Sequence, residues 1–155
     1  MEMLTKHVSI KEVSKSDTAI RLGIDNTPTG KHLENIKLLC EKVFEPIREW
    51  AKVPIKLSSV YRSEKLNKAV KGSSTSQHCA NDGAAMDIDN DGSTVTNAMI
   101  FDYVKSNIDF DQMIWEFGTE SNPDWVHISY KAKGNRKQIL KAVKQNGKTA
   151  YIPYK

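Results

Sequence analysis

One short stretch of the chain, residues 76–92, concentrates side chains that can bind a metal ion. It contains one imidazole and three carboxylates at alternate positions, namely His78, Asp87, Asp89 and Asp91. Side chains of a β-strand point alternately to opposite faces. A strand over Ala84–Asp89 would therefore present Asp87 on one face and pack Met86 and Ile88 against a core on the other. A histidine and an aspartate delivered to one point make half of a metal site.

The remaining ligand must come from elsewhere, and the chain has only three further histidines, His7, His32 and His127. His127 lies in the strand-like run Trp125–Tyr130, with Asp124 three residues before it. A catalytic zinc needs three protein ligands and one open position, which His78, Asp87 and His127 would supply. Zinc held in this way lowers the pKa of a bound water from ~16 to about 7.

Such a site also needs a carboxylate that takes a proton from water. Asp124 is the first candidate because it is tethered close to a ligand, and Glu116 is the second. Glu116 lies within an apolar run, so we expect it to hold a ligand imidazole or line the cleft instead. Arg62 would supply a fixed positive charge for a substrate carbonyl or carboxylate. Spacing alone leaves simpler alternatives open: a hydrogen-bonded core histidine, a turn aspartate at position 124 and a helix-capping arginine.

The run of acids after Asp87 offers a calcium site as an alternative. Residues 87–92 match the first half of an EF-hand loop, which requires a bidentate glutamate at its twelfth position and flanking helices. The twelfth position here is Ala98, and the preceding Gly-Ala-Ala-Met run is not typical of a helix. The sequence therefore favours a turn shaped by Asp89 and Asp91.

Length and composition indicate one domain spanning residues 1–155. With 39% hydrophobic and 27% charged residues, the chain is typical of a globular protein. No apolar run approaches the roughly 20 residues that cross a bilayer, and the N-terminus lacks the apolar stretch of a secretory signal. We therefore expect synthesis in the cytoplasm. The net charge of +4 only mildly favours anionic partners, so we expect no nucleic-acid partner. We also expect a monomer without a membrane partner.

Hydrophobic periodicity predicts the elements that must position these residues. The longest is a helix over residues 31–52, which Pro46 should kink or split. Shorter helices are predicted at 10–15, 64–70 and 94–107, and strands at 54–60, 84–89, 112–117 and 125–130. The tail, residues 136–154, should form a hairpin turning at Asn146-Gly147, with a helix over its first half as the alternative. The predicted fold class is α+β, a small antiparallel sheet backed by helices, with residues 1–30 otherwise irregular.

Five segments form a more specific combination. They are Ser-Val-Tyr-Arg-Ser at 59–63, Ser-Gln-His at 76–78, Gly-Ala-Ala-Met-Asp at 83–87, Ile-Trp-Glu-Phe at 114–117 and Trp-Val-His-Ile-Ser at 125–129. This combination resembles the M15 family of zinc D-Ala-D-Ala carboxypeptidases and murein endopeptidases, most closely its short single-domain members from phages and prophages. The resemblance implies zinc ligands at His78, Asp87 and His127, a general base at Asp124 and the family's arginine at Arg62.

The resemblance also implies a fold and a substrate. The fold is the one shared by D-Ala-D-Ala metallopeptidases and the Hedgehog signalling domain. The substrate is a peptidoglycan stem peptide with a D-amino acid at the cleaved bond, contacted by Ser76 and Glu116. A phage lysin of this kind would reach the cell wall at lysis. Two alternatives stay open: a non-hydrolytic, metal-containing wall-binding domain, and a cytoplasmic D-Ala-D-Ala dipeptidase.

The chain departs from the family's usual spacing at one point. Four residues, rather than two, separate His78 from Gly83. Metal ligands are fixed by geometry, so we expect the two extra residues to bulge as a loop while Gly83 and Asp87 keep their spacing.

Overall fold

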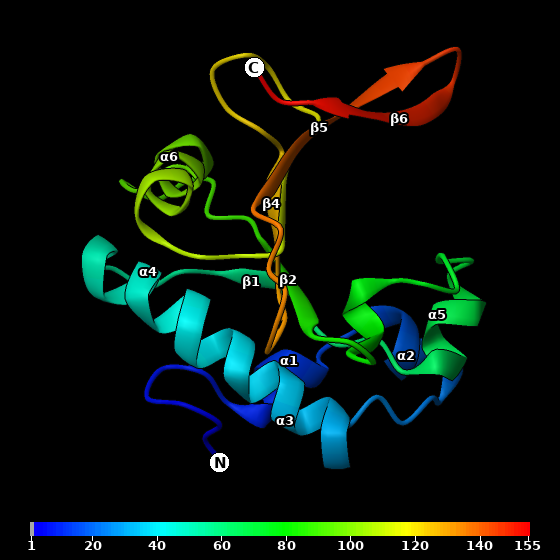
Figure 1. The fold of residues 1–155 in the computed structure, drawn as a ribbon. Helices are drawn as coiled ribbons and strands as arrows, with labels where there is room; N and C mark the ends of the chain where they lie inside the picture. The colour runs from blue at the N-terminus through cyan, green and yellow to red at the C-terminus, as the bar shows by residue number, and fades with distance from the viewer. Residues whose placement is uncertain (1) are drawn as a thin grey trace.

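The computed structural model describes residues 2–155 and shows a six-stranded sheet combined with helices (Figure 1). The helices are α1 (Ile10–Ser14), α2 (Asp17–Leu22), α3 (Gly30–Leu39), α4 (Glu45–Ala51), α5 (Glu64–Ala69) and α6 (Asn97–Asn107), with a π-helical turn, η1 (Cys40–Phe44), and a 3-10 turn, η2 (Gln77–Cys79). The strands are β1 (Leu57–Ser59), β2 (Ala84–Ile88), β3 (Gln112–Glu116), β4 (Trp125–Tyr130), β5 (Gln138–Gln145) and β6 (Lys148–Pro153). The predicted α+β class is confirmed. Within the described residues, no helix combines the length and apolarity that a membrane crossing requires.

The sheet has the order β1-β2-β4-β3-β5-β6 and is mixed. The prediction of an antiparallel sheet is wrong at one pairing, because β5 runs parallel to β3 and pairs Gln138 with Gln112. Strand β4 ends beside the start of β3, and residues 131–137 carry the chain across that end. Strand β5 therefore begins where β3 begins, a relation that local sequence patterns do not encode.

The predicted long helix is continuous from α3 through η1 to α4. In η1 the backbone N–H of Glu45 donates to the carbonyl of Cys40, five residues earlier. Pro46, which follows directly, has no N–H to donate. A one-residue widening of the helix therefore takes the place of the split predicted at Pro46.

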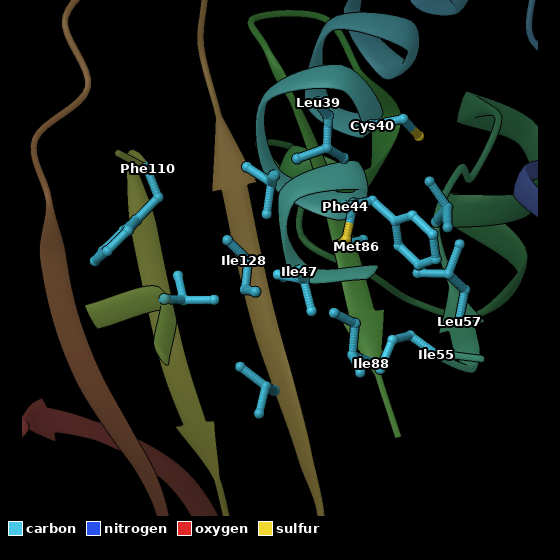
Figure 2. Packing of buried hydrophobic residues seen from close by; sticks show 14 of the residues in the cluster. Leu39, Cys40, Phe44, Ile47, Ile55, Leu57, Met86, Ile88, Phe110 and Ile128 are labelled. Carbon is cyan, nitrogen blue, oxygen red and sulfur yellow. The ribbon is translucent and has the colours of Figure 1, made fainter. Parts of the chain in front are cut away.

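The hydrophobic core lies between one face of the sheet and the long helix with α6 (Figure 2). Met86 and Ile88 of β2 and Ile128 of β4 are fully buried there, against helix residues such as Phe44 and Ile47. Their burial fixes the orientation of each strand, because a shift by one residue would expose all of these side chains to solvent. The residues between them, including Asp87, must therefore face the other side of the sheet.

That other face is only partly covered. In Figure 1 the sheet is seen nearly edge-on, with α4 and α6 on one side and α5 on the other, and the β5–β6 hairpin at the top extends toward the side of α5. The predicted hairpin is confirmed, and its turn residues Asn146 and Gly147 both have positive φ angles, 53° and 76°. The helical alternative for its first half is excluded.

Helix α2 differs from the irregular structure that the sequence predicts for residues 16–22. Ser16 caps it by accepting a hydrogen bond from the backbone of Ala19, and Gly23 ends it with a φ of 66°. Its larger apolar side chains, Ile20 and Leu22, are 78% and 51% exposed. A helix that buries so little leaves almost no hydrophobic period in the sequence.

Candidate metal centre

Three predicted ligands, His78, Asp87 and His127, meet on the face of the sheet opposite the core. One potential ligand atom from each lies within 4.8 Å of the others. Nε2 of His78 is 3.4 Å from Oδ2 of Asp87, and Nδ1 of His127 is 3.2 Å from Oδ1 of the same carboxylate. Strand β2 supplies Asp87, strand β4 supplies His127 directly opposite it, and η2 supplies His78.

Each imidazole is held by a hydrogen bond on the nitrogen that faces away from Asp87. Nδ1 of His78 lies 2.7 Å from the carbonyl oxygen of Val60, and Nε2 of His127 lies 2.9 Å from Oε1 of Gln77. A carbonyl oxygen only accepts, so both of these ring nitrogens carry the proton. The second nitrogen of each ring faces the carboxylate, and in a neutral ring it carries a lone pair.

A lone pair that faces a carboxylate repels it unless a cation, either a proton on the ring or a metal ion, lies between the two groups. The donor set of two imidazole nitrogens and one carboxylate oxygen, each backed by protein contacts, fits a catalytic zinc with an open position. The three side chains thus fit a zinc ion, the metal predicted from two histidines and one aspartate.

Protonation states at the centre also suit a metal. Burial raises the pKa of Asp87, but the adjacent His78 and His127 outweigh burial and hold it well below its usual range. Burial lowers the pKa of His127. An ionised carboxylate beside a neutral imidazole is the state in which these groups bind a metal.

Glu116 lies on the same face as the three candidate ligands. His127 pairs with Ile114 of β3, and Glu116, two residues along β3, pairs with Trp125. Paired residues and every second residue share a face, so Glu116 points into the cleft beside His127. Glu116 is only 6% exposed, and its pKa is raised to about 7, first by burial and then by the charge of Asp87.

Asp124, the first candidate from the sequence for the proton acceptor, does not line the cavity that contains the three candidate ligands. It precedes β4, and its side chain is exposed. Its backbone N–H donates to the carbonyl of Glu116 at 2.9 Å. Asp124 lies outside β4, so strand alternation does not fix the direction of its side chain relative to His127.

Arg62 and Ser76 both line the cavity and contact each other. Nη2 of Arg62 donates to Oγ of Ser76 at 2.8 Å, and the same oxygen accepts the backbone N–H of His78. The Nε atom of Arg62 is buried and has no hydrogen-bond partner within the described residues. Ser76 thus fixes the guanidinium, and Arg62 keeps a donor available.

The centre lies in an open cavity of about 630 Å³. Its wall includes Leu140 of β5 and Thr149 and Tyr151 of β6, which the sequence reasoning did not include in the site. No local motif marks these residues, because they reach the cavity only through the parallel pairing of β5 with β3.

The segment between His78 and Gly83, which carries the two extra residues, packs against α3 and away from the ligands. The carbonyl of Ala80 accepts a hydrogen bond from Asn35, and Asn81 contacts Nε2 of His32 at 3.0 Å. Gly83 has a φ of 76°, and a Cβ there would lie 2.3 Å from the carbonyl oxygen of Tyr130. Glycine is therefore required where the chain enters β2.

Asp89 and Asp91 follow the end of β2 and accept hydrogen bonds within a turn. Both carboxylates accept from the side-chain amide of Asn97, and Asp91 also accepts from that of Asn122. These contacts agree with the turn predicted for the two acids.

Comparison with known proteins gives one family. A family model described as Peptidase M15 matches residues 6–129, a stretch that includes the three candidate ligands together with Arg62, Glu116 and Asp124. No curated protein matches the chain. The match ends within β4, so the hairpin strands that complete the cavity wall lie beyond it.

Proposed function

Because the chain belongs to the peptidase M15 family, which implies a metallopeptidase, we propose that it is a zinc enzyme that cleaves peptide bonds in bacterial peptidoglycan stem peptides. The observation that carries this proposal is the His78, Asp87 and His127 cluster, which has ligand atoms within 4.8 Å of one another in an open cavity. The family resemblance implies that the cleaved bond involves a D-amino acid and that the protein acts as a phage lysin.

Zinc held by these three residues would polarise the substrate carbonyl and make a water molecule more acidic. Glu116 accepts the proton of the attacking water and passes it to the leaving amine. Its burial, its raised pKa and its place on the ligand face support this role over Asp124. This proposal exchanges the roles that the sequence and the family resemblance predicted for the two acids.

Arg62 stabilises the negative charge that develops on the substrate carbonyl oxygen. Its guanidinium is already fixed by Ser76, so little ordering is needed when the substrate binds. Arg62 lines the cavity beside the candidate ligands, and this placement supports a role toward the substrate.

The shape of the cleft supports cleavage within a peptide more than removal of a terminal residue. A second polar cavity of about 510 Å³ adjoins the first and shares Thr75, Ser76, Gln77 and Arg136 with it. A substrate chain can therefore continue past the metal centre. Stem peptides carry free carboxylates, which suit a cleft bordered by two arginines.

Digestion of purified peptidoglycan, with products identified by mass spectrometry, tests the proposal. We expect new amino termini within or between stem peptides for the wild type, and no products for Glu116→Gln or His127→Ala. Cleavage of free D-Ala-D-Ala alone would favour the dipeptidase alternative. Zinc binding without hydrolysis of any fragment would favour the wall-binding alternative.

A further inference from the structure

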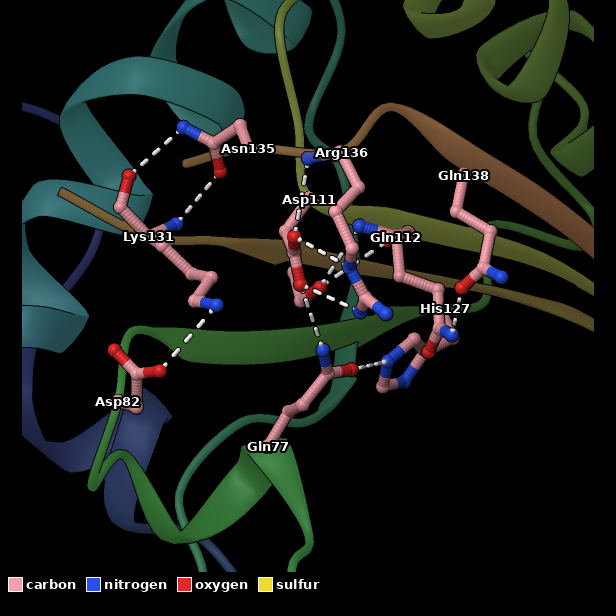
Figure 3. Close-up of polar contacts among 10 residues, drawn as sticks. Gln77, Asp82, Asp111, Gln112, His127, Lys131, Asn135, Arg136 and Gln138 are labelled. Carbon is pink, nitrogen blue, oxygen red and sulfur yellow. Dashed lines mark hydrogen bonds and ion pairs between the residues drawn. The ribbon is translucent and has the colours of Figure 1, made fainter. Parts of the chain in front are cut away.

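Gln77 connects the metal centre to an ion pair that lies outside it (Figure 3). Its Oε1 lies 2.9 Å from Nε2 of His127, and its Nε2 donates to Oδ2 of Asp111 at 3.2 Å. Asp111 in turn accepts two hydrogen bonds of 2.9 Å from the guanidinium of Arg136 and one of 3.1 Å from the Arg136 backbone. The three polar groups thus form a continuous chain that ends on a candidate ligand.

The direction of every hydrogen bond in this chain is determined by Asp111. Burial raises the pKa of Asp111, but the hydrogen bonds from Arg136 outweigh burial and hold it below its usual range. The carboxylate is therefore ionised and only accepts. Gln77 must turn its NH₂ group to Asp111, which leaves its oxygen for His127.

An oxygen acceptor at Nε2 selects one form of the His127 ring. Nε2 must carry the proton, so in the neutral ring Nδ1, which lies 3.2 Å from Asp87, carries the lone pair that a metal would take. If the amide of Gln77 were reversed, its NH₂ would face Nε2 and would favour the tautomer that cannot bind a metal through Nδ1.

We propose that Gln77 is a positioning residue that fixes the tautomer and orientation of His127, and that the Asp111–Arg136 pair fixes Gln77. This inference rests on the proposed role of His127 as a zinc ligand. Asp111 is 1% exposed, so water does not compete freely for its oxygens. Arg136 lies after the stretch matched by the family model, so the support for this ligand extends into the C-terminal part of the chain.

The first test removes the hydrogen bonds of Gln77 and keeps its approximate volume. We expect Gln77→Leu to weaken zinc binding roughly 10- to 100-fold, measured by competition with a chromophoric chelator. Gln112 offers a matched control, because its amide bonds to Gln138 at 2.8 Å and not to a ligand. Gln112→Leu should leave the zinc affinity unchanged.

The second test exchanges the charges of the chain. Gln77→Glu replaces the donated hydrogen bond to Asp111 with repulsion between two carboxylates. This variant should therefore weaken zinc binding as well. Adding Asp111→Asn restores a donor toward position 77 and an acceptor toward His127. The double variant should therefore regain most of the affinity that Gln77→Glu loses, which a general packing defect would not allow.

The third readout needs neither zinc nor activity. Imidazole nitrogen NMR of the metal-free protein should show a proton on Nε2 of His127 in the wild type, whereas in Gln77→Leu the neutral ring should carry its proton on Nδ1, which faces Asp87. An unchanged tautomer or an unchanged zinc affinity in that variant would overturn the inference. If Gln77→Leu changes both the tautomer and the zinc affinity but the wild type cleaves no peptide, the proposed function is refuted and this inference stands.

Discussion

The two walls of the cleft differ in how firmly they are held. On the metal side, His78 and His127 are 6% and 8% exposed, and each ring is anchored by a carbonyl oxygen. On the hairpin side, Tyr151 is 57% exposed and belongs to the edge strand β6. Reacting groups require fixed geometry, whereas substrate contacts tolerate change. We infer that the chemistry resides in the first wall and substrate preference in the second.

The family match follows the same division, since it covers the metal side and ends before the hairpin. Substitutions on the two walls should therefore have different signatures. Those on the metal side should affect zinc content or the rate of the chemical step, and those on the hairpin should affect substrate binding.

The largest effect is expected for His127→Ala. This change removes one of three ligands, so zinc should be lost or greatly weakened and hydrolysis should fall below detection. Elemental analysis of the purified variant measures the metal content. His32→Ala is a suitable control, because His32 contacts Tyr61 and Asn81 outside the centre. Full zinc retention by His127→Ala would refute the ligand assignment.

Next in size is the effect of Glu116→Gln. Loss of the proton acceptor should lower the rate roughly 100- to 10,000-fold while zinc content and fold are retained. Asp124→Asn, at an exposed position outside the cavity lining, should stay close to the wild type. Steady-state assays on peptidoglycan fragments measure both. An inactive, zinc-loaded Asp124→Asn beside an active Glu116→Gln would restore the roles predicted from sequence.

The burial of Glu116 should also make the stability of the metal-free protein depend on pH. Its pKa is about 7 in the folded protein and near 4.5 when unfolded, so between these values only the folded state retains the proton. The stability that this proton provides is present at pH 4.5 and is lost as the pH rises to 7, an effect on the order of 3 kcal/mol.

Urea unfolding with a chelator, at several pH values, measures this loss. The wild type should lose stability over this range relative to Glu116→Gln, whose side chain does not titrate. A constant difference between the two proteins would contradict the prediction. A hairpin variant such as Tyr151→Ala should keep the pH dependence of the wild type.

The smallest effect is expected for Tyr151→Ala. Removing an exposed aromatic contact should raise KM roughly 3- to 10-fold and leave kcat and zinc content nearly unchanged. Ile152 precedes Pro153 on the same strand but does not line the cavity, so Ile152→Ala is the matched control. A drop in kcat alone for Tyr151→Ala would assign this residue to the chemical step and remove the distinction between the walls.

Much of the fold was determined by short-range patterns in the sequence. Strand β4 has the predicted bounds, the Asn146-Gly147 turn produces the predicted hairpin, and alternation around Asp87 orients β2 correctly. These features depend on neighbours within a few residues, where side-chain period and turn chemistry are decisive. The choice of His78, Asp87 and His127 as candidate ligands also followed from residue type and spacing.

Only the tertiary structure determines which other side chains lie beside the three candidate ligands. The pairing of β3 with β4 brings Glu116 to the ligand face, and the loop before β5 brings Arg136 to Asp111 and thereby supports Gln77. The hairpin reaches the cavity through a parallel pairing with β3. Strand partner and register arise from the packing of the whole core, so no local period in the sequence can specify them.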